Sequence, residues 1–90
     1  MESDLLALKN LGNTSVNWLR AVGVHTREDL HRLGPVTAYN RIRERGIRVS
    51  RVLLYALQGA LLDIHWNELE PDLKQQLVAE ADRKLDATST

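Results

Sequence analysis

The chain has 90 residues, with 12 Lys/Arg balanced by 12 Asp/Glu, and it contains no cysteine. This length predicts one domain, and the lack of cysteine excludes disulfides, thiolate metal ligands and a cysteine nucleophile. No apolar run reaches the ~18 residues that a membrane helix requires. Residues 1–4 are acidic, unlike the start of a secretory signal. We therefore expect a cytoplasmic domain that has no membrane partner.

The positive charges are concentrated in the first two thirds of the chain. Residues 1–58 contain nine Lys/Arg against five Asp/Glu, whereas residues 59–90 contain three against seven. The centre of the basic half is a set of arginines opposed locally only by Glu44, namely Arg41, Arg43, Arg45, Arg48 and Arg51. A neutral molecule with this distribution can offer a basic face to an acidic partner. The alternative is that the arginines simply solvate an exposed helix.

Every segment between the glycine and proline residues has helical rather than strand periodicity. The predicted elements are a short turn over residues 4–8 and helices from Asn13 or Thr14 to Gly23, from Arg27 to Gly34, from Pro35 to Gly46, from Arg51 to about Ile64, and from Pro71 onward. We therefore expect an all-α fold: a compact five- to six-helix domain of the helix-hairpin-helix or SAM-domain-like type. The domain is expected to span residues 1–86, with a frayed tail at residues 87–90.

Polar residues mark the expected helix starts. Asn13 or Thr14 can accept a hydrogen bond from a free N–H group at the start of the second element, and Ser50 can do the same for the helix that follows it. Thr26 lies three residues before Asp29, which is the spacing of a capping box.

The segment from residue 51 to 64 is apolar on most sides, which is typical of a central helix packed by several neighbours. Gly59 lies within it, where glycine is less favourable than alanine by up to about 1 kcal/mol. We interpret Gly59 as a structural residue that allows another helix to approach closely. Gly23 is the second structural glycine, because a left-handed residue there would close the preceding helix.

Residues 8–16 have the outline of a helix-hairpin-helix turn, in which two glycines allow backbone N–H groups to face a DNA phosphate. Gly12 matches the second glycine, and Asn10 replaces the first, since asparagine tolerates the left-handed conformation. Asn13 and Thr14 stand where a proline and a lysine often occur. Two interpretations remain open, a phosphate-binding hairpin and a purely structural one.

The segment His65-Trp66-Asn67 places a histidine near Asp63 and Glu68. These three polar residues do not converge on one helical face, so the spacing does not support a metal site. We expect a structured connection between the last two helices instead. In it, His65 lies near a helix C-terminus, Trp66 packs inward, and Asn67 satisfies free backbone groups.

No catalytic arrangement is visible in the sequence. A Ser–His–Asp order, a pair of buried carboxylates and a glycine-rich phosphate loop are all missing from it. A chain of this size also has little room for a deep cleft. We therefore expect no enzymatic activity, no cofactor and no metal.

Several motifs occur together in this chain. They are Leu8-x-x-Leu11-Gly12, Trp18-Leu19-x-x-Val22-Gly23-Val24, Leu53-Leu54-Tyr55-Ala56-Leu57-x-Gly59-Ala60-Leu61 and His65-Trp66-Asn67-Glu68-Leu69. From about Asp4 to Leu77, the chain resembles the C-terminal domain of the TfoX/Sxy competence regulators of bacteria. The resemblance implies a small all-helical domain with a role in regulating DNA uptake and natural transformation. In that family, TfoX acts as a co-activator with the cyclic-AMP receptor protein.

These observations lead to two hypotheses of function. The first is a non-enzymatic regulatory domain that acts through contacts with a transcription regulator or a TfoX N-terminal-type domain, with non-specific binding to the DNA backbone as a further possibility. The second is a protein-interaction or self-association module without any nucleic-acid role. The residues expected to contact DNA or a partner are Lys9, Gly12, Asn13, Thr14, Arg41, Arg45 and Arg48.

Overall fold

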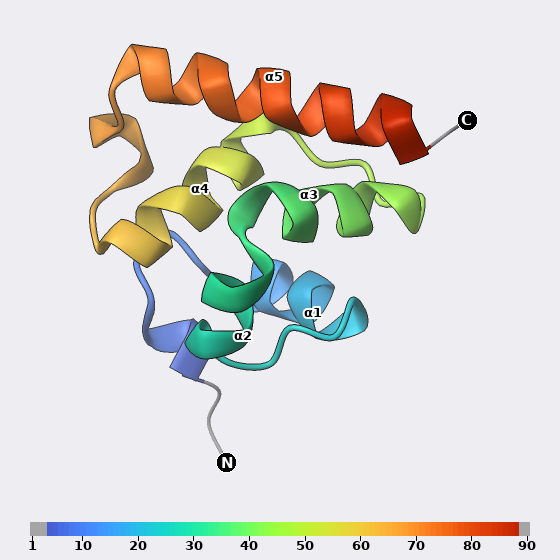
Figure 1. Ribbon diagram of the computed structural model, residues 1–90. Helices are drawn as coiled ribbons and strands as arrows, with labels where there is room; N and C mark the ends of the chain where they lie inside the picture. The colour runs from blue at the N-terminus through green and yellow to red at the C-terminus, as the bar shows by residue number, and fades with distance from the viewer. Residues whose placement is uncertain (1–3, 89–90) are drawn as a thin grey trace.

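The computed structural model describes residues 4–88, and the regular elements in this range are all helical (Figure 1). They are η1 (Asp4–Ala7), α1 (Asn13–Ala21), α2 (Arg27–Leu33), α3 (Pro35–Glu44), α4 (Arg51–Leu62), η2 (Trp66–Glu68) and α5 (Pro71–Thr88). The all-α prediction is confirmed. Residues 87 and 88 of the expected tail belong to α5, whereas residues 89 and 90 lie outside the described part of the chain.

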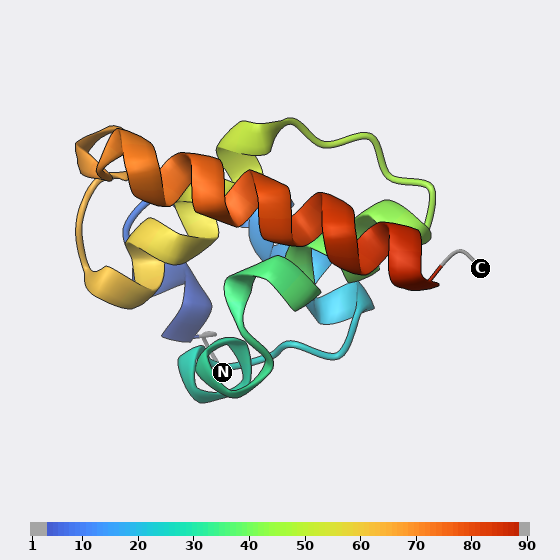
Figure 2. The same cartoon turned by 45° about the horizontal axis from the view of Figure 1, so that its top comes forward.

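The helices form three layers, with the α3–α4 pair in the middle (Figures 1 and 2). The long helix α5 lies across one side of this pair and contacts both helices. On the other side, α1 contacts α3, and α2 contacts both α3 and α4. Asn40, which is buried, ties two layers together because its Nδ2 donates a hydrogen bond of 2.9 Å to the carbonyl of Ala81 in α5.

Helix α4 is the central helix, as its wide apolar surface predicts. It contacts α2, α3, α5 and η2, and its Leu54 and Leu57 are completely buried. Burial of each such leucine contributes about 1.5–3 kcal/mol. The helix ends at Leu62, earlier than the expected Ile64, because Asp63 adopts a left-handed conformation with φ 59°.

The structure confirms one predicted helix start and corrects two others. Thr26 caps α2, since its Oγ1 accepts a hydrogen bond of 3.0 Å from the N–H of Asp29. The prediction that Asn13 or Thr14 caps α1 is wrong. Gly12 occupies the N-cap position in an extended conformation, so both of these residues already belong to the helix. Ser50 occupies the N-cap position of α4, but its side chain makes no capping hydrogen bond.

A single residue joins α2 to α3. Gly34 is both the C-cap of α2 and the N-cap of α3, with φ 90° and ψ 152°. Its N–H donates to the carbonyl of Leu30, and its own carbonyl accepts from the N–H of Ala38. Pro35 follows as the first helical residue, where the missing N–H of proline removes no intrahelical hydrogen bond.

Candidate partner-binding surfaces

The hairpin before α1 has the left-handed residue at position 10 that its sequence predicts. Asn10 is left-handed with φ 73°, and Gly12 precedes the helix in an extended conformation. Gly12, Asn13 and Thr14 are exposed, and no side chain caps this helix start. The element before the hairpin is the four-residue 3-10 helix η1 rather than an α-helix.

The side chain of Asn10 turns inward and binds the end of α4 and the start of η2. Its Oδ1 accepts a hydrogen bond of 3.1 Å from the N–H of Trp66. Its Nδ2 donates to the carbonyls of Ile64 at 3.0 Å and Ala56 at 3.4 Å. A glycine at this position would provide the same backbone but none of these bonds. The hairpin is therefore braced against the C-terminal half of the domain.

This brace also explains Gly59. A Cβ atom at Gly59 would lie 2.7 Å from Nδ2 of Asn10 and 2.8 Å from the carbonyl oxygen of Ile64. The prediction that another helix approaches Gly59 is therefore corrected. The neighbours are the Asn10 side chain and the segment that follows α4. Gly23 has φ 89° and follows the last turn of α1, as expected.

Three predicted contact residues form the basic end of the molecule. Arg41, Arg45 and Arg48 are exposed, and they form no ion pair with any of the described residues. Arg43 behaves differently. Its guanidinium lies 4.7 Å from the centre of the Tyr39 ring, and its Nη2 lies 3.7 Å from the Asp82 carboxylate. The three exposed arginines therefore remain available to an acidic partner, whereas Arg43 is used within the fold.

The structure does not bring the two sets of predicted contact residues together. Lys9, Gly12, Asn13 and Thr14 belong to the hairpin region, which Figures 1 and 2 place on the side of the C-terminal end of α4. The arginines belong to the last turn of α3 and the following connection, which lie at the opposite end in both views. The two sets are thus separate surfaces.

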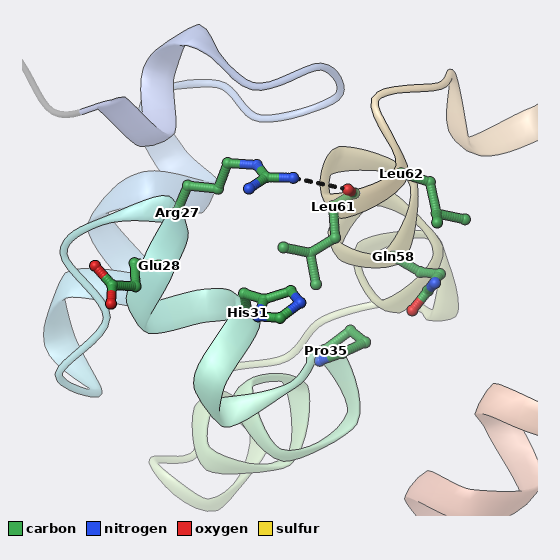
Figure 3. A pocket seen from close by; sticks show the side chains of 7 residues that line it. All are labelled: Arg27, Glu28, His31, Pro35, Gln58, Leu61 and Leu62. Carbon is green, nitrogen blue, oxygen red and sulfur yellow. Dashed lines mark hydrogen bonds between the residues drawn. The ribbon is translucent and has the colours of Figure 1, made fainter.

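A groove between α2 and α4 was not predicted from the sequence. It has a volume of about 690 Å³ and is lined by Arg27, Glu28, His31, Pro35, Gln58, Leu61 and Leu62. Figure 3 shows His31 and Leu61 pointing toward one another between the helices, and Glu28 pointing away. Nη2 of Arg27 crosses the groove to donate a hydrogen bond of 3.1 Å to the carbonyl of Leu61. The one feature of the sequence that could have indicated this groove is the apolar pair Leu61-Leu62 at the end of α4.

One edge of this groove carries an apolar side chain that is accessible to solvent. Leu62 is 50% exposed. Among the described side chains, no other large apolar residue is as exposed. An exposed leucine beside a concave surface that carries a few polar groups is typical of a binding site for another molecule.

The segment from His65 to Asn67 is a structured connection that starts just after the end of α4, as expected. Two details differ: Trp66 lies less deep than predicted, and the Asn67 side chain contacts the His65 ring at 2.7 Å instead of a backbone group. His65 is the N-cap of η2, and its Nδ1 accepts a hydrogen bond from the N–H of Asn67. Trp66 is half-buried rather than part of the core. Its ring stacks against Tyr55 at 6.2 Å, and the Lys74 ammonium lies 5.3 Å from the ring centre. This arrangement fixes the connection between α4 and α5.

Metal binding and membrane insertion are the next two properties to consider for the described residues. Among the side chains that the structure describes, no group of three or more His, Asp or Glu could hold a metal ion. Over the same part of the chain, no helix is both long and apolar enough to cross a membrane.

The sequence of this chain matches a known domain family over most of its length. The sequence model of the TfoX C-terminal domain matches residues 1–81. The chain belongs to the TfoX C-terminal domain family. This TfoX C-terminal domain is therefore a competence-related domain of a regulatory type. No curated protein matches the chain.

Two solved structures share the fold of this TfoX C-terminal domain. The first is a protein of unknown function from Listeria monocytogenes in a tetragonal crystal form, with a TM-score of 0.80 and 32% sequence identity. The match covers 90% of this chain and 99% of that one. The second is an uncharacterized protein from Listeria monocytogenes in a triclinic form, with a TM-score of 0.77 and 34% identity. That match covers 81% of this chain and 83% of the other.

Proposed function

We propose that this TfoX C-terminal domain is a non-enzymatic regulatory module that binds a protein partner through the groove between α2 and α4. The observation that carries the proposal is the groove itself, with Leu62 half-exposed on its rim. The partners that the family suggests are a TfoX N-terminal-type domain and a transcription regulator.

The chemistry of the groove supports a protein segment as its occupant. Leu61, Leu62 and Pro35 provide apolar contact, while Gln58 and His31 provide polar groups that can fix an orientation. Apolar grooves between two helices commonly receive the apolar face of a partner helix, with a few side chains as anchors. Its volume of about 690 Å³ falls within the range of ligand-binding clefts.

The test is a titration of the isotope-labelled domain with a TfoX N-terminal domain. A separate titration uses the cyclic-AMP receptor protein as the transcription regulator. We expect amide shifts at residues 27–31 and 58–62. Leu62→Lys should weaken binding by at least about tenfold, which corresponds to about 1.4 kcal/mol, because it replaces the apolar side chain at this edge of the groove with a charge.

Val52→Lys is the matched control, since Val52 is 41% exposed on the same helix but does not line the groove. It should change the affinity by less than about twofold, as expected for a surface position outside an interface. Equal losses for the two variants, or shifts confined to other surfaces, would contradict the proposal.

The second candidate function is binding to the DNA backbone, and the exposed arginines favour it. Arg41, Arg45 and Arg48 lie within eight positions of one another, and they have no carboxylate partner among the described residues. Arginine forms bidentate contacts with phosphate, and such contacts make the affinity strongly dependent on salt.

A short mixed-sequence duplex and a series of salt concentrations test this second candidate. Removing two phosphate contacts with the double variant R45A/R48A should lower the slope of log affinity against log salt by about 2. The double variant Q75E/Q76E changes the net charge equally at two exposed positions of α5, so it is the matched control. An unchanged slope in R45A/R48A would rule out these two arginines as phosphate contacts.

A further inference from the structure

The charges of this neutral chain are separated along its length. One end is formed by the last turn of α3 and the connection to α4 (Figures 1 and 2). It carries the exposed arginines Arg41, Arg45 and Arg48. The exposed carboxylates at this end are Glu44 and Asp82, and Asp82 pairs with Arg43. We call this surface the basic end.

The opposite end is formed by the connection from α4 through η2 to the first turn of α5 (Figures 1 and 2). It carries four exposed carboxylates, Asp63, Glu68, Glu70 and Asp72, and the hairpin bonded to this connection adds one exposed cation, Lys9. The nearby Lys74 is half-buried, and its ammonium lies over the rings of Tyr55 and Trp66. We call this surface the acidic end.

We infer that the basic end of one copy of this chain binds the acidic end of another. The two surfaces have opposite charge and similar numbers of charged groups, and the longest dimension of the molecule is 39 Å. That length exceeds the Debye length of about 10 Å at 0.1 M salt. Salt therefore screens the charges at the two ends of one copy from each other. Each end therefore attracts the opposite end of a second copy.

The contact is heterologous in an end-to-end chain of copies, whereas an antiparallel pair forms it twice about a two-fold axis. An antiparallel pair and an end-to-end chain of copies both bring a basic end against an acidic end. Exposed ion pairs are individually weak, so the association is expected at high protein concentration and low ionic strength. It should disappear as salt shortens the Debye length from about 30 Å at 0.01 M to about 3 Å at 1 M.

Charge reversal tests the inference by analytical ultracentrifugation. The triple variant R41E/R45E/R48E has two acidic ends, and the triple variant E68K/E70K/D72K has two basic ends. Wild-type protein should gain mass with concentration at about 0.01 M salt and should be monomeric at about 1 M salt. Each reversed variant alone should remain monomeric at both salt concentrations, and an equimolar mixture of the two should associate again.

The control is E28Q, which removes an exposed charge on α2 outside both ends. It should associate like the wild type, and circular dichroism should show that all the variants are folded. Three results would overturn the inference: a monomeric wild type at low salt, association of one reversed variant by itself, or a mixture that stays monomeric. The uncharged groove variant Leu62→Asn should leave the association unchanged, so this inference and the proposed function can fail separately.

Discussion

Replacing Asn10 by glycine tests how much its side-chain hydrogen bonds to the end of α4 and to η2 contribute to stability. Glycine adopts φ 73° without strain, so the variant keeps the turn and removes only the side chain. Two of the lost hydrogen bonds have good lengths, 3.1 Å with Trp66 and 3.0 Å with Ile64. At about 1 kcal/mol for each, N10G should lower the free energy of unfolding by about 2 kcal/mol. N10A should cost about 1 kcal/mol more, because alanine is strained in the left-handed region.

The same brace predicts a coupling between Asn10 and Gly59. In the wild-type protein, Gly59→Ala should cost about 1–3 kcal/mol, because its Cβ would lie 2.7 Å from Nδ2 of Asn10. In the N10G background that clash disappears, although the Ile64 carbonyl remains at 2.8 Å. The double variant should therefore lose less stability than the sum of the single losses, by at least about 0.5 kcal/mol.

Urea unfolding followed by circular dichroism measures all four members of this cycle. For a domain of this size, a loss of 2 kcal/mol also lowers Tm by roughly 10 °C. Additive effects within error would refute the direct contact between the two residues. A loss below about 0.5 kcal/mol for N10G would show that the three hydrogen bonds contribute little to stability.

Three further predictions concern helix ends. Thr26→Ala removes the cap of α2 and should lower the free energy of unfolding by about 1 kcal/mol, measured by urea titration. Gly34→Ala should cost about 1–3 kcal/mol in the same assay, because φ 90° with ψ 152° is a conformation nearly confined to glycine. The N–H of His25 donates to the Asp29 carboxylate and, with Thr26, lowers its pKa below the ordinary 3.8. The ionised carboxylate therefore stabilises the fold above pH 4, and this contribution is lost as the pH falls through the folded-state pKa. Asp29→Asn should remove that part of the acid dependence, and an unchanged pH profile would contradict this assignment.

Local signals in the sequence were enough to predict the helices. Pro35 marks the first residue of α3, Thr26 caps α2, and Gly23 follows α1 with a positive φ. Each of these residues acts on its immediate neighbours, so its effect can be inferred from spacing. The errors at Asn13 and Ser50 are also local: α1 begins one residue earlier than a cap at Asn13 requires, and Ser50 takes the N-cap position without a side-chain hydrogen bond.

The surfaces were harder to predict because they depend on contacts between distant residues. The side chain of Asn10 bonds to residues 46 to 56 positions away, and spacing alone does not show this. Arg43 has the same residue type as its neighbours but turns toward Tyr39 and Asp82. The groove exists only because α2 and α4 pack side by side, which is a property of the tertiary fold.

The one-residue junction at Gly34 has a mechanical consequence for the groove. Helix α2 forms one wall of the groove, and Gly34 is the single residue between α2 and α3. A ligand that pushes α2 outward must therefore rotate α3 with it or change the backbone angles of Gly34 itself. Since α3 carries Arg41 in its last turn, one wall of the groove and part of the basic end belong to two helices that share a single-residue junction.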